Sequence, residues 1–209
     1  FYEECQVKFK SNSSNYIRMK KIALTGIIGS GKTTAAAFFK DLGIPVFIAD
    51  DCAKDLMISD SELKTQIINL LGEFAYTDGK LNKEFISEQI FNNKNLLDSV
   101  NSLIHPRVQK AFDLWVKNQN SSYVIYEAAL IFENNSQNIF DKIICVKTPL
   151  NIIHERICNR ENYSKKRVDK ILDSQLSQDV KCSMSDFCIE NTSKEKLLSE
   201  INRIHSLLL

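Results

Sequence analysis

The stretch Gly26-Ile27-Ile28-Gly29-Ser30-Gly31-Lys32-Thr33 determines how the rest of the chain is interpreted. It fits the pattern G-x-x-x-x-G-K-[ST], and three of the six glycines of the chain lie within it. In such a loop, backbone N–H groups converge on phosphate oxygens, which requires φ values that only glycine adopts at little cost. The N-terminus of the following helix adds partial positive charge. The stretch therefore predicts a nucleotide phosphate site, with Lys32 at the β- and γ-phosphates and the Thr33 hydroxyl on Mg²⁺.

The sequence on either side of this loop predicts a parallel β-sheet. Residues 22–24 are a short apolar run that ends at Thr25, as expected of a buried strand entering a glycine-rich turn. A helix is expected from about Lys32 until Gly43 stops it, and residues 45–48 form the next strand. A strand, a helix and a strand in this order are the βαβ unit of a parallel sheet.

The segments that follow extend this sheet and add helices. Residues 52–119 carry helical patterns without a convincing strand, and we interpret them as a mostly helical insertion. The sheet is expected to resume at residues 123–126 and 143–146 and to end with a short strand at 187–189. Inside the insertion, local signals predict a turn and two helix caps. These are Asp78-Gly79 for the turn, and Asn82 and Asn93 for the caps.

Three further helices are expected after the insertion. Thr148-Pro149 predicts the first, with threonine as the cap and proline at the first helical position. The second is expected to begin at Ser164, and the third at a capping box of Thr192 and Glu195. The apolar faces of the last two helices are expected to be Val168, Ile171, Leu172 and Leu176, and then Leu197, Leu198, Ile201, Ile204 and Leu208.

Length and composition suit one α/β domain with an inserted helical part. The chain has 209 residues, of which 44% are apolar and 25% are charged, and its net charge is +1. This balance gives no support to a protein that binds duplex nucleic acid, because such proteins usually carry a basic excess. No apolar run approaches the roughly 18 residues that span a bilayer. We therefore expect no nucleic-acid partner and no membrane association.

The cysteines and the first residues also favour a cytoplasmic protein. None of the six cysteines forms a C-x-x-C pair or has zinc-ligand spacing with a histidine, so we expect reduced core thiols. Residues 1–18 are polar and lack the apolar core of a signal peptide. Met19 directly precedes the first strand, and we expect it to be the natural start, with the residues before it as an extension outside the fold.

Two patterns separate the chain from other phosphate-loop classes. A GTPase usually carries a base-reading N-K-x-D segment, and this sequence contains none. A larger ATPase usually carries an apolar strand that ends in aspartate, whereas residues 123–126 end at Glu127, a weak substitute. Neither pattern argues against a kinase that acts on a small acceptor, so this class of protein stays open.

Asp50 is a candidate catalytic carboxylate. It follows the second predicted strand, and ligands of parallel sheets bind outside the carboxyl ends of the strands, so its carboxylate is expected near the phosphate loop. There it could accept the proton of a substrate hydroxyl or help to hold Mg²⁺. Alternatively it is a helix N-cap with a structural role, a position that Asp51 could also fill.

Arg156 and Arg160 form a candidate phosphate clamp. Their i, i+4 spacing places both guanidinium groups on one helix face. Two such groups suit a lid that closes on phosphates and offsets the charge that develops during transfer. The alternative is a solvated basic face, for which Glu155 supplies a partner.

Taken in order along the chain, these features resemble the dephospho-coenzyme A kinase family. The resemblance runs from about Lys21 to the final helix. Several further segments also resemble the family pattern. They are Ala23-Leu24-Thr25-Gly26, Leu42-Gly43-Ile44-Pro45-Val46, Asp78-Gly79-Lys80-Leu81, Ile90-Phe91, Ile104-His105-Pro106 with Val108, Leu130-Ile131-Phe132-Glu133, Gln175, and Asp186 to Asn191. The sequence departs from the pattern at Ile48, at Lys83 in place of arginine, and at Glu127 to Ile131, where a proline is absent.

The resemblance implies an α/β, P-loop kinase-like three-layer fold with a central parallel sheet, a helical substrate-binding insertion and a helical lid. It implies transfer of the ATP γ-phosphate, with Mg²⁺, to the ribose 3′-hydroxyl of dephospho-coenzyme A in a cytoplasmic protein that we expect to be a monomer. The expected parts are an extension at 1–18, a nucleotide-binding core at 19–51, 120–148 and 186–209, a coenzyme A part at 52–119, and a lid at 149–185.

The resemblance also implies a set of site residues. The expected catalytic residues are Asp50, Lys32 and Arg156. Nucleotide contacts are expected from Gly29, Ser30, Gly31, Lys32, Thr33, Thr34, Arg160 and Asn191, and acceptor contacts from Thr25, Asp50, Lys83, His105 and Glu127. For His105 a packing or helix-capping role stays open. The alternative functions are another nucleoside-monophosphate or small-molecule kinase, an ATP-dependent switch, and a degenerate binding module.

Overall fold

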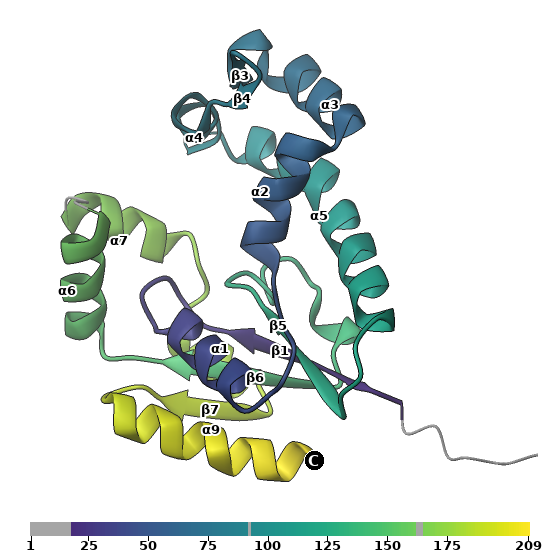
Figure 1. Ribbon diagram of the computed structural model, residues 1–209. Helices are drawn as coiled ribbons and strands as arrows, with labels where there is room; N and C mark the ends of the chain where they lie inside the picture. The colour runs from purple at the N-terminus through teal and green to yellow at the C-terminus, as the bar shows by residue number, and fades with distance from the viewer. Residues whose placement is uncertain (1–17, 92, 162–164) are drawn as a thin grey trace, which may run out of the picture.

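A five-stranded parallel sheet forms the centre of the molecule (Figure 1). The computed structural model describes residues 18–91, 93–161 and 165–209. The strands lie in the order β2-β5-β1-β6-β7, and every neighbouring pair is parallel. Their bounds are β1 (Lys20–Thr25), β2 (Val46–Ile48), β5 (Tyr123–Glu127), β6 (Lys142–Lys147) and β7 (Phe187–Glu190). The predicted fold class, an α/β protein built on a parallel sheet, is confirmed.

Successive side chains along each central strand point to opposite faces of the sheet, and both faces are buried. Ile22 and Leu24 of β1 point to one face, where they pack with α1 (Lys32–Asp41) and α9 (Lys194–Leu208). Ala23, which lies between them, points to the other face and packs with Ile131 and Phe132. Because both faces are covered, the central strands are continuous apolar runs, as the sequence predicted.

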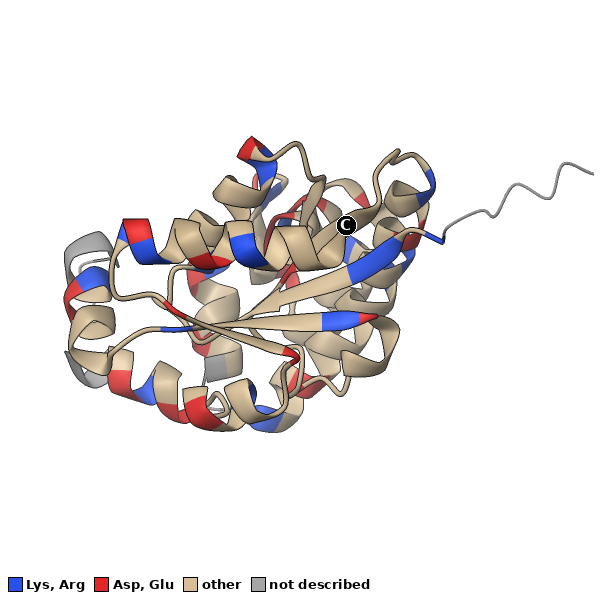
Figure 2. Cartoon of the chain, turned by 90° about the horizontal axis from the view of Figure 1, so that it is seen from below, with Lys and Arg blue, Asp and Glu red and all other residues tan. Residues whose placement is uncertain are grey.

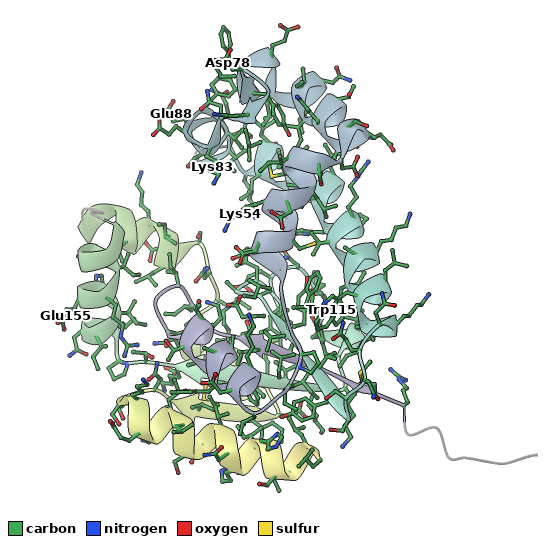
Figure 3. The ribbon with its side chains drawn as sticks, in the orientation of Figure 1. Lys54, Asp78, Lys83, Glu88, Trp115 and Glu155 are labelled. Atoms are coloured by element: carbon green, nitrogen blue, oxygen red, sulfur yellow. A yellow bond between two sulfur atoms is a disulfide. The ribbon has the colours of Figure 1, made fainter. Side chains whose placement is uncertain are left out.

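The helical insertion stands away from the sheet at one side (Figure 1). An aromatic cluster joins it to the sheet: the ring centroids of Phe47 and Phe112 are 5.2 Å apart, and those of Phe112 and Tyr126 are 4.8 Å apart. Trp115 lies beside this cluster at the sheet end of α5 (Figure 3). The insertion comprises α2 (Ala49–Ser59), α3 (Ser61–Leu71), η1 (Glu73–Ala75), β3 (Tyr76–Thr77), β4 (Lys80–Leu81), α4 (Lys83–Phe91) and α5 (Lys94–Lys117).

Two helices lie across from the insertion, α6 (Leu150–Glu161) and α7 (Lys165–Asp173), while the short α8 (Gln178–Ser183) contacts β6 (Figure 1). Ile153 and Ile157 of α6 and Val168 of α7 pack on Ile27, so the phosphate loop shares an apolar cluster with α6 and α7. The short helix η2 (Gln137–Ile139) precedes β6. In the described part of the chain, Lys and Arg are interspersed with Asp and Glu along the helices (Figure 2). None of the described helices is both long and apolar enough to cross a membrane.

Several local predictions are confirmed. Asp78 and Gly79 form the turn between β3 and β4, two strands of two residues each that the sequence did not predict. The side chain of Asn82 accepts a hydrogen bond from Phe85 N at 3.1 Å, and that of Asn93 accepts one from Leu96 N at 3.1 Å. Both asparagines therefore act as the predicted caps.

Other helix ends differ from the prediction. α2 begins at Ala49 with no side-chain cap, so Asp50 lies in its first turn and is not an N-cap. The cap of α9 is Ser193, which accepts from Lys196 N, rather than Thr192. Thr148 uses its hydroxyl for a long-range contact described below. Two leucines that were expected on apolar helix faces differ from the prediction: Leu198 is 39% exposed, and Leu176 lies beyond the end of α7. Ser164, which was expected to begin a helix, lies outside the described residues.

The cysteine prediction was wrong for one pair. Cys182 of α8 and Cys188 of β7 form a disulfide, which joins the short helix to the edge strand. Cys145, by contrast, is a buried free thiol, and burial raises its pKa to about 11. The two bonded residues are only six positions apart in the sequence.

Candidate active site

The phosphate loop connects the end of β1 to the start of α1, as predicted. Gly26, Gly29 and Gly31 all have positive φ, at 148°, 75° and 94°. A side chain at Gly31 would also overlap Nδ2 of the buried Asn191, so this position requires glycine for both its backbone and its space. Thr33 and Thr34 are exposed in the first turn of the helix, beside the loop.

The loop is braced from behind by two buried side chains. The carbonyl of Ser30 accepts a hydrogen bond from Thr148 Oγ1 at 2.7 Å and another from Asn191 Nδ2 at 2.8 Å. The Oγ of Ser30 itself is buried and has no hydrogen-bond partner among the residues that the structure describes. A buried hydroxyl without a partner is costly, and a phosphate oxygen or a water could satisfy it. These contacts bring the predicted residue Asn191 to the loop.

Lys32 is held close to the loop by a backbone contact. Within the described part of the chain its Nζ forms no ion pair and donates a hydrogen bond to the carbonyl of Ile27 at 3.2 Å. Burial lowers the pKa of Lys32, while the nearby carboxylates of Glu127 and Asp50 act in the opposite direction. An ammonium group in this setting is available to an incoming phosphate.

Two of the residues expected to contact an acceptor lie at the carboxyl ends of adjacent strands. Glu127 at the end of β5 pairs in register with Leu24 of β1 and with Ile48 of β2, and Asp50 follows two residues after Ile48. Glu127 is 6% exposed, and burial raises its pKa, with Asp50 adding to the rise and Lys32 opposing it. Asp50 is exposed on the first turn of α2. The sheet therefore gathers two carboxylates and one ammonium group, as expected from the strand order.

Thr25 is the last residue of β1 and comes directly before the loop. It is fully buried, and its hydroxyl donates to the carbonyl of Ala129 at 3.1 Å. This contact fixes the segment that follows β5 against the base of the phosphate loop.

Arg156 reaches the phosphate loop from α6. It is exposed, and its Nη1 lies 3.6 Å from the point that a Cβ on Gly31 would occupy. The structure thus places Arg156 beside the loop, and its role as a phosphate clamp rather than a solvated basic residue stays a prediction. Arg160 lies in the last turn of α6, and its side chain lies outside the described part.

Lys83 and His105 belong to the insertion rather than to the sheet edge. Lys83 starts α4, and in Figure 3 it points, together with Lys54 of α2, toward the side where α6 and α7 lie. His105 is exposed in the middle of α5, directly before Pro106, so it is not a helix cap. Within the described ranges, no hydrogen bond or ion pair joins either residue to the phosphate loop.

Four residues that contact the site region were not predicted as site residues. Gln175 accepts a hydrogen bond from Ile28 N of the loop at 3.0 Å. Gln178 bonds both the N–H and the carbonyl of Thr148, each at 2.8 Å. Lys181 and Glu133 form a buried ion pair. The family pattern contains Gln175 and Glu133, but their partners lie 147 and 48 residues away, so no local signal indicates these contacts.

Nothing in the described residues forms an all-protein metal cage, because no group of three or more His, Cys, Asp or Glu side chains converges there. Mg²⁺ does not require one, since in nucleotide sites it usually keeps waters and bridges substrate phosphates. The exposed hydroxyl of Thr33 and the carboxylate of Asp50 are the oxygen ligands that these residues could offer.

Comparison with known proteins gives a consistent result. Residues 20–196 match the family model for dephospho-CoA kinase. The chain is 32% identical over 182 residues to the dephospho-CoA kinase of Bacteroides fragilis strain YCH46, covering 87% of this chain and 89% of that protein. It is 35% identical over 187 residues to the dephospho-CoA kinase of Gamma-proteobacterium EBAC31A08, covering 88% and 95%. Its fold is similar to that of the crystal structure of TT1252 from Thermus thermophilus, with a TM-score of 0.82, 23% identity, and coverage of 91% and 98%.

Proposed function

The chain belongs to the dephospho-CoA kinase family, and from this premise we propose that it transfers the γ-phosphate of ATP to the ribose 3′-hydroxyl of dephospho-CoA. The products are CoA and ADP, and the reaction is the final step of CoA biosynthesis. The observation that carries the proposal is the family match over residues 20–196, which includes the phosphate loop and both carboxylates at the sheet edge.

The donor side of the reaction uses the phosphate loop. Its backbone N–H groups would bind the ATP phosphates, with Lys32 at the β- and γ-phosphates and Asn191 and Thr34 as further nucleotide contacts. Thr33 would hold Mg²⁺ together with phosphate oxygens, and the bound ion would neutralise part of the phosphate charge. Arg156 lies close enough to Gly31 to offset the charge that develops on the transferred group, with Arg160 as its neighbour on α6.

The acceptor side uses the sheet edge. Asp50 would take the proton of the 3′-hydroxyl as the hydroxyl oxygen attacks the γ-phosphate. Glu127 is buried at the same edge and would contact the acceptor there; burial raises its pKa, with Lys32 opposing the rise and Asp50 adding to it. Placing two carboxylates in different environments allows them to take different roles. Thr25 would fix the adjacent backbone through its contact with Ala129.

The remaining parts of the chain would bind the rest of the acceptor and close the site. Residues 52–119 would bind the CoA moiety through Lys83 and His105, and residues 149–185 would form the lid. Lys83 and Lys54 point toward the side where the lid helices lie, which suits contact with the anionic diphosphate of the acceptor (Figure 3). We also propose that the enzyme works as a monomer in the cytoplasm.

The test is ADP release with Mg-ATP and four acceptor conditions: dephospho-CoA, AMP, adenosine and no acceptor. We expect turnover only with dephospho-CoA, and we expect Lys32→Met to abolish it. Turnover with AMP alone would assign the chain to the monophosphate kinases. ADP release that does not depend on any acceptor would instead support an ATP-dependent switch.

A further inference from the structure

A buried ion pair lies between α8 and the segment that follows β5. Lys181 of α8 is fully buried, and its ammonium nitrogen lies 2.7 Å from Oε1 and 2.9 Å from Oε2 of Glu133. The same nitrogen donates to the carbonyl of Ala129 at 2.7 Å. The side chain of Glu133 is 18% exposed, so the pair is largely shielded from water. Among the described residues, the carboxylate of Glu133 and the carbonyl of Ala129 are the acceptors of this ammonium group.

Stability alone does not explain this pair. Lysine is almost never fully buried, because removing its charge from water is costly. A buried ion pair can often be replaced by apolar side chains of similar volume with no loss of stability. A charged pair fixes the relative orientation of the two segments that carry it, because each hydrogen-bond donor and acceptor must hold a fixed position.

Two series of hydrogen bonds link the ion pair indirectly to the phosphate loop. On one route, the carbonyl of Ala129 also accepts the hydroxyl of Thr25, the residue directly before the loop. On the other, Oε1 of Glu133 accepts a hydrogen bond from Leu176 N at 2.9 Å, and the neighbouring Gln175 accepts one from Ile28 N within the loop. The pair therefore joins the connection between α7 and α8 to the segment that begins directly after Glu127.

We propose that Lys181 and Glu133 are positioning residues that hold residues 128–133 and the α7–α8 connection in a fixed relation to the phosphate loop. The inference rests on the proposed function, since the segment they fix begins directly after Glu127, which that function assigns to the acceptor. Lys181 is fully buried, so it acts through Ala129 and Glu133 rather than by touching a substrate. The pair keeps the acceptor hydroxyl in line with the γ-phosphate.

Nucleotide binding is expected to depend much less on this pair. The loop carbonyl of Ser30 is held separately by Thr148 and Asn191, and neither contact involves Lys181 or Glu133. Loss of the pair therefore displaces the acceptor segment while the phosphate loop keeps its own braces. The predicted signature is a defect in acceptor kinetics with nearly unchanged ATP affinity.

The test is the double variant Lys181→Met/Glu133→Leu, which replaces the charges by apolar side chains. We expect its Tm to lie close to that of the wild type, whereas each single variant, Lys181→Met and Glu133→Leu, unfolds at a lower temperature because one charge is left unpaired. We expect kcat/KM for dephospho-CoA to fall about 100-fold in the double variant, as a small misplacement of a reacting group can cause. The Kd of a non-hydrolysable ATP analogue should stay close to the wild-type value.

A matched control is Lys147→Met, which removes an ammonium group from another ion pair to the same helix. Lys147 of β6 lies 2.6 Å from Asp179 of α8, but this pair is exposed, so we expect little change in either Tm or kinetics. A double variant with wild-type stability and wild-type kcat/KM would overturn the positioning role. So would equal losses in ATP affinity and acceptor kinetics. The proposed function is judged separately, by whether the wild type phosphorylates dephospho-CoA.

Discussion

Replacing Gly31 by alanine is expected to damage both the fold and the nucleotide site. The backbone of Gly31 is left-handed, with φ 94° and ψ 21°, and a Cβ there would overlap Nδ2 of Asn191. Asn191 is 3% exposed and anchored to the Ser30 carbonyl at 2.8 Å, so it can move only by giving up that hydrogen bond.

The magnitude follows from two contributions. A non-glycine residue in the left-handed region costs about 1–2 kcal/mol. Leaving a buried hydrogen-bonding group without its partner costs about 1–3 kcal/mol more. Gly31→Ala should therefore lower the free energy of unfolding by about 2–5 kcal/mol. We also expect the KM for ATP to rise about tenfold, which corresponds to about 1.4 kcal/mol of lost binding.

The matched control is Gly43→Ala. Gly43 also has positive φ, at 78°, but no atom lies within 4 Å of the Cβ that alanine would add. It should therefore show the backbone cost alone and leave the KM for ATP unchanged. The double variant Gly31→Ala/Asn191→Ala should lose little more stability than Gly31→Ala, because both changes remove the same hydrogen bond. Urea unfolding and steady-state kinetics measure these quantities. Equal effects of Gly31→Ala and Gly43→Ala, with unchanged ATP kinetics in both, would refute the reasoning.

Four further perturbations test other parts of the account. Asp50→Ala should lower kcat at least about 100-fold with little change in ATP binding, because a positioned proton acceptor typically contributes 10²–10⁴. Arg156→Ala should lower kcat more than it weakens ATP binding, because its target charge develops during transfer. Glu127→Gln should raise Tm at pH 7. Burial raises the pKa of Glu127 above its ordinary 4.5, so the stability of the wild type falls as pH rises from 4.5 through the pKa of the folded state. Glutamine does not ionise, and the variant therefore avoids this loss. Cys188→Ser, which removes the disulfide to Cys182, should cost about 2 kcal/mol of stability by the chain-entropy estimate for so short a loop.

For each of these four predictions, kinetics or thermal unfolding can also give a result that contradicts it. A near-normal kcat in Asp50→Ala would remove the general-base role, and an effect of Arg156→Ala confined to ATP affinity would reduce that arginine to a ground-state contact. A lower Tm of Glu127→Gln at pH 7 would mean that the ionised carboxylate is net stabilising. A reductant that leaves the Tm of the wild type unchanged would argue against any contribution from the disulfide.

The core of the fold could be predicted because its signals are local. The glycine spacing of the phosphate loop and the apolar runs at residues 22–24 and 45–48 each reflect neighbouring residues that act together. The caps at Asn82 and Asn93 were identified for the same reason.

The errors arose where a long-range contact or two equivalent neighbours decided the outcome. Thr192 and Ser193 are neighbouring residues that both make good caps, and the structure uses Ser193. Thr148 was expected to cap a helix, but its hydroxyl bonds the Ser30 carbonyl 118 residues earlier. The bond between Cys182 and Cys188 depends on α8 lying beside β7, which no spacing rule indicates.

The site could be predicted in part for the same physical reason. Asp50 was expected at this edge because ligands of a parallel sheet bind outside the carboxyl ends of its strands, whereas Glu127 was expected only from the family resemblance, and the register of β5 with β2 places both there. Lys181 was missed because a lone lysine in a short polar helix usually faces solvent, and its burial follows only from the position of Glu133.

The measurement that tests the central claim most directly is ³¹P NMR of the product formed from Mg-ATP and dephospho-CoA. The account predicts a new phosphomonoester on the ribose 3′-position of the acceptor, formed in equal amount to ADP and absent with Lys32→Met. ADP formed with the dephospho-CoA left unmodified, or a phosphate attached elsewhere on it, would contradict the account.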